Sequence, residues 1–109
     1  MSTVSDIGQR SFGDIAPTFA ELTDQVLFDR IWQDPALSPR DRSLATVSVL
    51  LALGRTEQLA FHLRRARDNG IDTASLAALV THLAFYAGWP AAASALPLLR
   101  ALATEEPAA

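Results

Sequence analysis

The chain of 109 residues has no cysteine, and the nine residues counted as lysine or arginine are all arginine. The absence of cysteine excludes disulfides, thiolate metal sites and a Cys-x-x-Cys redox centre. The absence of lysine excludes Schiff-base chemistry on a lysine amine and leaves guanidinium groups, which suit carboxylates, as the permanent cations. The two histidines, His62 and His82, have no carboxylate cluster at ligand spacing around them, so we expect no bound metal.

The sequence is also poor in positive charge and in long apolar runs. Its formal net charge is -3, whereas binding to phosphates needs a positive surface, so we expect no nucleic-acid partner. No uninterrupted apolar stretch approaches the roughly 20 residues that span a bilayer, and the first residues lack the apolar core of a signal peptide. We therefore expect a cytoplasmic protein without a membrane partner.

The residues that are present predict helices throughout. Half of them are apolar, which is enough for one core, so we expect a single domain over residues 1–109. Caps, prolines and apolar spacing place the helices at residues 16–22, 24–33, 39–53, 57–69, 73–87 and 90–102. Pro97 lies inside the last of these and should bend it. We expect residues 1–11 to form a loose arm and residues 104–109 a frayed tail. The predicted fold class is all-α, a bundle of five to six helices.

The predicted helix over residues 57–69 carries the first candidate site. His62 flanks the buried stripe of this helix, where one proton can matter to a bound small molecule. At about 100° per residue, Gln58, His62 and Arg65 line one edge of the stripe, while Glu57 and Arg64 lie on the far side. We interpret the arginines of this helix as a solvated face with at most an interfacial role.

A second group of residues lies on the predicted helix over residues 73–87 and just after it. His82, Phe85 and Trp89 fall near one line, and Tyr86 follows His82 at the i+4 position. A histidine on an apolar flank is more often buried or interfacial than catalytic, so His82 ranks below His62. The number of apolar and aromatic residues in so short a chain also predicts self-association.

Three sequence blocks, LSPRDRSL, HLRRARDNGI and THLAFYAGWPAA, occur in this order between residues 12 and 102. Together they resemble the carboxymuconolactone decarboxylase family in its short single-domain form. The resemblance implies an all-helical fold related to the alkylhydroperoxidase D proteins, assembled as a trimer or hexamer with active sites near subunit contacts. The peroxidase branch of that superfamily has a Cys-x-x-Cys pair ahead of a histidine. Arg55 and Gln58 stand at the cysteine positions here and His62 at the histidine, so thiol peroxidase chemistry is excluded.

The reaction that the resemblance implies is the removal of CO2 from a small carboxylated lactone in aromatic-compound catabolism, without a cofactor. Such a reaction needs a cation that orients the anionic substrate and a general acid that protonates the developing carbanion. We predict His62 as the general acid/base, with Glu57 and Gln58 beside it as the other catalytic candidates. The predicted substrate-binding residues are Arg42, Arg55, His82, Tyr86 and Trp89.

Two alternatives stay open at this point. The chain could be a related lyase or isomerase with a different small-molecule substrate. It could instead be a non-catalytic oligomeric protein that binds a small molecule or acts as a scaffold.

Overall fold

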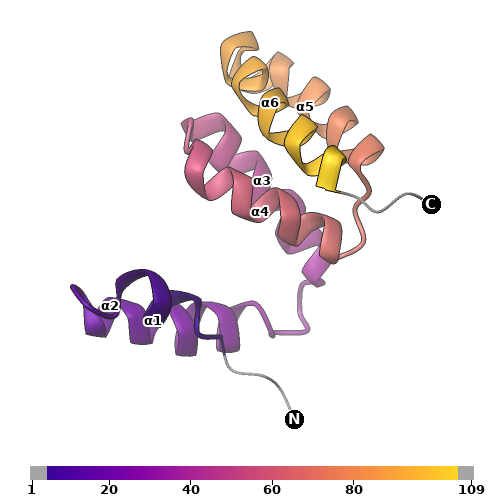
Figure 1. Ribbon diagram of the computed structural model, residues 1–109. Helices are drawn as coiled ribbons and strands as arrows, with labels where there is room; N and C mark the ends of the chain where they lie inside the picture. Colours follow the sequence, from indigo (N-terminus) through magenta and orange to yellow (C-terminus); the bar gives the residue numbers. More distant parts are fainter. Residues whose placement is uncertain (1–4, 106–109) are drawn as a thin grey trace. The chain divides into compact units, whose positions relative to one another are not determined.

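The computed structural model describes residues 5–105, and that range is helical without a strand. The elements are α1 (Ile7–Phe12), α2 (Pro17–Leu22), the π-helix η1 (Thr23–Ile31), α3 (Pro39–Leu53), α4 (Thr56–Asp68), α5 (Thr73–Ala87) and α6 (Trp89–Glu105), shown in Figure 1. The all-α fold class predicted from the sequence is confirmed. The helices form two compact units, one ending at Pro39 and the other beginning at Arg40.

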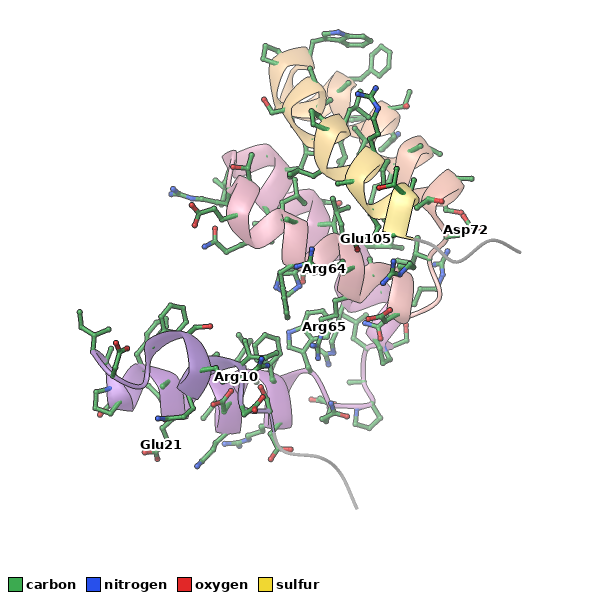
Figure 2. The ribbon with its side chains drawn as sticks, viewed as in Figure 1. Arg10, Glu21, Arg64, Arg65, Asp72 and Glu105 are labelled. Carbon is green, nitrogen blue, oxygen red and sulfur yellow. The ribbon has the colours of Figure 1, made fainter. Side chains whose placement is uncertain are left out.

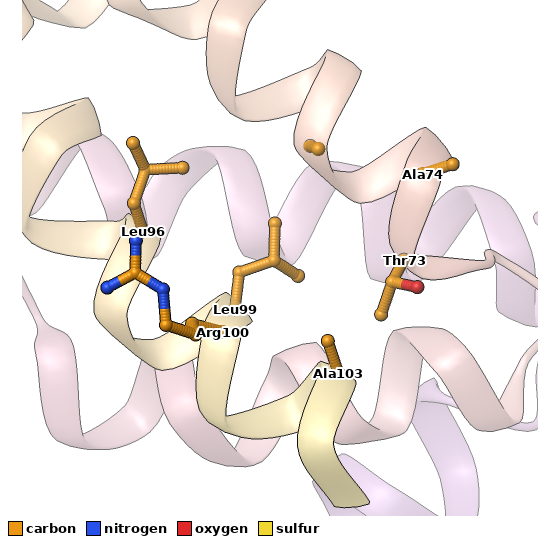
Figure 3. A pocket seen from close by; sticks show the side chains of 7 residues that line it. Thr73, Ala74, Leu96, Leu99, Arg100 and Ala103 are labelled. Carbon is orange, nitrogen blue, oxygen red and sulfur yellow. The ribbon is translucent and has the colours of Figure 1, made fainter. Parts of the chain in front are cut away.

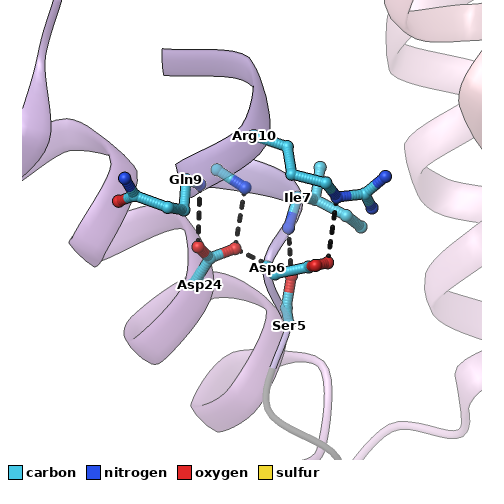
Figure 4. Close-up of polar contacts among 7 residues, drawn as sticks. Ser5, Asp6, Ile7, Gln9, Arg10 and Asp24 are labelled. Atoms are coloured by element: carbon cyan, nitrogen blue, oxygen red, sulfur yellow. Dashed lines mark hydrogen bonds and ion pairs between the residues drawn. The ribbon is translucent and has the colours of Figure 1, made fainter. Parts of the chain in front are cut away.

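The first unit contains α1, α2 and η1, and a buried carboxylate joins α1 to η1. Asp24 of η1 accepts hydrogen bonds from the backbone N–H groups of Gly8 (2.7 Å) and Gln9 (3.0 Å) and from the Ser5 hydroxyl (2.8 Å), as Figure 4 shows. The N–H groups in the first turn of a helix have no partner within the helix. Asp24 supplies that partner from a separate helix, which fixes where α1 begins.

The helix α1 is a departure from expectation. We expected residues 1–11 to form a loose arm, whereas Ile7–Phe12 is helical. A close contact at Gly8 accompanies the Asp24 bonds, because a Cβ at this glycine would lie 2.5 Å from the carbonyl oxygen of Ala20. Only glycine allows α1 to lie so close to α2. Residues 1–4 lie outside the described part of the chain.

The second unit contains α3 to α6 around one apolar core. The core residues recur at three- and four-residue spacing on each helix, and Ile71 joins them from the linker between α4 and α5. They are Val47, Leu51, Leu59, Leu63, Ala66, Ile71, Leu76, Val80, Ala84, Ala92, Ala95, Leu99 and Leu102. Helix α6 packs against both α5 and α4. It continues through Pro97 to Glu105, so Thr104 and Glu105 belong to this helix rather than to the expected tail, and residues 106–109 are not described.

Helices α3 and α4 form a hairpin in this unit, and α4 carries His62. Gly54, with φ +70, makes the turn in the left-handed conformation that glycine adopts at low cost. At the other end, the Asn69 side-chain amide donates a hydrogen bond of 3.0 Å to the hydroxyl of Ser43, which is buried. This bond aligns the end of α4 with the beginning of α3.

Candidate functional site

Helix α4 positions His62 at the edge of its buried stripe. Leu59, Leu63 and Ala66 are buried in the core as their spacing predicted. At about 100° per residue, His62 lies about 40° around the helix from Ala66 and about 60° from Leu59. The imidazole is therefore half-buried. Its ring packs edge-on against that of Phe61, with 4.9 Å between the centroids.

At this position the protonated, positively charged form of His62 is disfavoured. Burial lowers the pKa of the imidazole, and the nearby Arg65 guanidinium lowers it further, to about 4. Both effects disfavour the charged form. His62 is therefore uncharged at neutral pH in the ligand-free chain and can accept a proton. A general acid at this position needs a negative charge beside it before it can hold the proton that it donates.

Arg65 is the residue that we had not singled out for the site. It lies one turn after His62 on the same edge of α4 and is half-buried, whereas its neighbour Arg64 is exposed; both are labelled in Figure 2. Burial lowers the pKa of Arg65, although the Asp68 carboxylate acts to raise it. The sequence did indicate Arg65, because its spacing puts it on the same edge as His62. We had grouped it with the other arginines of this helix as a solvated face.

The two other predicted catalytic residues lie in the first turn of α4. Gln58 is one turn ahead of His62 on the same edge, and Glu57 is on the opposite side of the helix. Both side chains are exposed. Within α4, the half-buried polar residues of this edge are thus His62 and Arg65, and Asn69 follows on the same edge just after the helix ends.

The two predicted substrate-binding arginines lie at opposite ends of the α3–α4 hairpin. Arg42 is half-buried in the first turn of α3, beside the Ser43 hydrogen bond. Arg55 is exposed in the turn before α4. Thirteen residues separate them, which is about 20 Å along a helix at about 1.5 Å per residue. One carboxylate cannot bridge two arginines placed in this way.

The remaining predicted residues lie where α5 ends and α6 begins, and all are exposed. The rings of His82 and Tyr86 are tilted by 39° with 5.0 Å between their centroids, and Phe85 meets Trp89 edge-on at 6.3 Å. Tyr86 is 79% exposed and Trp89 68% exposed. His82 points about 160° away from Ala84, which faces the core shared with α4. Within one chain, this aromatic group and His62 therefore belong to different faces.

Two open hollows follow the seam between α5 and α6. The larger has a volume of about 470 Å3 and is lined mainly by apolar side chains, with Arg100 as its cation. Figure 3 shows Leu99 and Ala103 of α6 opposite Thr73 of α5 at this hollow. The smaller, of about 120 Å3, lies beside Trp89. His62 lines neither of these two hollows.

Residues 5–105 contain neither a cluster of metal-ligating side chains nor a helix that could span a membrane. No group of three or more histidine, aspartate or glutamate side chains in this range could hold a metal ion. No helix in the same range is long and apolar enough to cross a membrane.

Comparison with known proteins identifies the family of this chain. The family model of the carboxymuconolactone decarboxylases matches residues 17–101, so both compact units contribute to the matched region. The chain is 36% identical to 4-carboxymuconolactone decarboxylase of Acinetobacter baylyi over 86 residues, which are 79% of this chain and 64% of the relative. It is 30% identical to nitrosuccinic acid decarboxylase of Metarhizium robertsii over 76 residues, 70% of this chain and 53% of that protein. The chain thus spans less than two thirds of the length of these relatives. The match over most of the chain confirms the resemblance found in the sequence: the chain belongs to the carboxymuconolactone decarboxylase family.

Proposed function

We propose that the chain is a cofactor-independent decarboxylase of a small carboxylated lactone or ring compound, with His62 as general acid/base. The observation that carries the proposal is the similarity to two proteins named as decarboxylases of small carboxylic acids. The half-buried pair of His62 and Arg65 on α4 supports it, because it offers a proton acceptor and a cation at one place.

The proposed step breaks the bond between the substrate carbon and its carboxylate. CO2 leaves, the electron pair stays on the substrate, and a proton from His62 adds to the carbon that has lost the carboxylate. A lactone carbonyl or a nitro group can accept the electron pair while the bond breaks. This electron sink lies within the substrate, so the reaction needs no cofactor.

His62 must be protonated before it can act as the acid. In the ligand-free chain it is uncharged at neutral pH, because burial and Arg65 lower its pKa to about 4. A substrate carboxylate bound beside it has the opposite effect, because a nearby negative charge favours the imidazolium. Substrate binding and proton uptake by His62 are coupled in this scheme.

Nitrosuccinic acid has two carboxyl groups. When it loses one of them as CO2, the product keeps the other as an anionic group.

We also propose that the active protein is a homo-oligomer in the cytoplasm, as a trimer or hexamer. Apolar side chains are exposed in both units, among them Ile15 (82%) and Phe19 (56%) in the first and Phe85 (77%) in the second. Exposed apolar groups of this size are typical of protein interfaces. Light scattering of the purified chain coupled to size exclusion should give a mass of three or six chains, and a monomer would contradict the proposal.

The test of the reaction is CO2 release by the purified chain from 4-carboxymuconolactone and from nitrosuccinic acid. His62→Gln should lower kcat by about 100-fold or more, the usual contribution of a general acid/base. Thermal unfolding of the variant shows whether it is folded, and added imidazole should restore part of the activity of His62→Ala.

Three outcomes separate the alternatives. If His62→Gln releases CO2 at the rate of the unchanged chain, the role given to His62 is wrong. Conversion of either compound without CO2 release would favour a related lyase or isomerase. Binding without conversion would favour a non-catalytic binding protein.

A further inference from the structure

Helices α5 and α6 carry an uncharged stretch of the chain on which aromatic side chains are exposed. No Asp, Glu, Lys or Arg occurs from Thr73 to Leu99. The two helices pack side by side, as Figure 1 shows. Where α5 ends and α6 begins, Phe85, Tyr86 and Trp89 are each more than two thirds exposed. An exposed surface without charge and rich in aromatic rings is typical of the core of a protein interface.

The rest of the chain differs from this α5–α6 face in its charge. All acidic and basic residues lie before Thr73 or after Leu99, and together they give a formal net charge of -3. Two copies that meet through such charged surfaces repel each other, whereas two α5–α6 faces bring none of these charges together. A partner with a charged surface would instead lose water from its charges without gaining an opposite charge. Charge complementarity therefore favours a second copy of this chain as the occupant of this face.

The same face holds a projecting side chain beside a hollow. Phe85 is exposed and meets Trp89 edge-on, and Trp89 also lines the hollow of about 120 Å3 between α5 and α6. Thr81 lines this hollow as well, and it lies about 40° around α5 from Phe85. The other residues around the hollow are alanine, valine and leucine. A face that contains both a projection and an apolar hollow can fit a copy of itself, as a two-fold contact requires.

We infer that the α5–α6 face is a two-fold interface between copies of this chain, in which Phe85 of each copy packs into the hollow of the other. The inference deepens the proposed homo-oligomer and rests on that proposal for the presence of several copies. A two-fold contact joins the chains in pairs, so the number of copies is even. Of the trimer and the hexamer, this contact selects the hexamer.

The test is the mass of the purified full chain, measured by light scattering coupled to size exclusion. Phe85→Glu places a charge without a partner in the contact, so it should raise the Kd of this contact by about 100-fold or more and halve the mass to three chains. Phe85→Leu stays apolar and should keep six chains. Arg64→Glu, on the exposed side of α4, changes the net charge twice as much and should also keep six chains. Thermal unfolding by circular dichroism shows that each variant is folded.

A mixture of Phe85→Glu with Phe85→Arg tests the two-fold geometry. In a two-fold contact each copy presents the same face to its partner, so the opposite charges of the two variants meet. The equimolar mixture should therefore regain a mass of six chains, whereas each variant alone should give three. In a head-to-tail contact the face would meet a different surface of the partner. A mixture that stays at three chains would overturn the two-fold contact.

The measured masses separate this inference from the proposals on which it rests. An unchanged chain of three copies, or six copies that persist in Phe85→Glu, would overturn the inference and leave the proposed homo-oligomer standing. A dimer that dissociates in Phe85→Glu would support the inference and contradict the proposed trimer or hexamer. A monomer would overturn both. CO2 release by the unchanged chain tests the decarboxylase proposal separately.

Discussion

Asp24 in the first unit and His62 in the second are both ionisable groups withdrawn from water. The surroundings of Asp24 stabilise its charged form, whereas those of His62 disfavour its charged form. Burial alone would raise the pKa of the Asp24 carboxyl, but donors from Gly8, Ser5 and Gln9 together lower it below its ordinary value. Burial lowers the pKa of His62, and Arg65 adds to the effect. The charge of Asp24 is stabilised by the fold, whereas that of His62 is suppressed. The first arrangement is typical of a structural group and the second of a reactive one.

The apolar side chains of the two units differ as well. In the second unit, leucines such as Leu51, Leu63 and Leu76 are almost fully buried in one core. In the first unit, Phe19 and Leu22 are more than half exposed. The second unit thus has the larger buried apolar core, whereas the first unit buries Ala20, Phe28 and Trp32 and adds the hydrogen bonds of Asp24.

The largest expected effect is on the core of the second unit. Leu76→Ala should lower the free energy of unfolding by about 2–5 kcal/mol, because it removes a fully buried side chain and leaves a cavity. The matched change Leu22→Ala, at a position 53% exposed, should alter it by less than about 0.5 kcal/mol. Urea unfolding followed by circular dichroism measures both. Equal losses would show that the two units share the apolar contribution more evenly than their burial indicates.

The next largest effect is expected at Asp24, whose carboxylate accepts hydrogen bonds from the first turn of α1. Asp24→Asn removes the charge and one acceptor oxygen, so the Gly8 and Gln9 amides should lose most of their protection from hydrogen exchange. The folded pKa of Asp24 is lowered, so its stabilising effect is complete above the ordinary value of 3.8 and disappears as the pH falls below it. Asp29→Asn, on the same helix η1, is the control and should leave this protection unchanged. Protected amides in Asp24→Asn would mean that α1 does not depend on the carboxylate.

A smaller effect should come from the pH dependence of stability at His62. Between pH 6.5 and about 4, the unfolded chain binds a proton at this residue that the folded chain does not. The contribution of the uncharged imidazole is therefore complete above pH 6.5 and decreases as the pH falls towards 4. Urea unfolding at pH 7 and pH 5.5 should give a difference that shrinks in His62→Gln and persists in His82→Gln. An unchanged difference in His62→Gln would place the pH dependence elsewhere.

The smallest effect separates the two causes of the low pKa of His62. Arg65→Gln should raise this pKa by less than about one unit, because burial is the larger cause and remains. The exposed Arg64 is the control, and Arg64→Gln should leave the pKa unchanged. Titration of the imidazole by NMR gives both values. A return to about 6.5 in Arg65→Gln would make the guanidinium, rather than burial, the dominant cause.

Local signals predicted most of the helices and the position of His62. The proline start and glycine stop of residues 39–53 agree with α3, and the spacing of Leu59, Leu63 and Ala66 placed the buried face of α4. The same spacing put His62 at the edge of that face, where the structure has it. The roles given to Glu57, Gln58, Arg42, Arg55, His82, Tyr86 and Trp89 stay predictions.

The sequence by itself determined the helical fold class and the face of α4 on which His62 lies, because caps, turns and apolar periods act within a few residues of one another. It also determined the family, through three sequence blocks in a fixed order. Tertiary structure alone decided that α1 begins at Ile7, because its cap, Asp24, comes from another helix. It also decided that Arg65 is half-buried while Gln58, which the spacing put on the same edge beside His62, is exposed. Both outcomes depend on burial and on contacts between distant parts of the chain, and residue spacing along one helix does not contain that information.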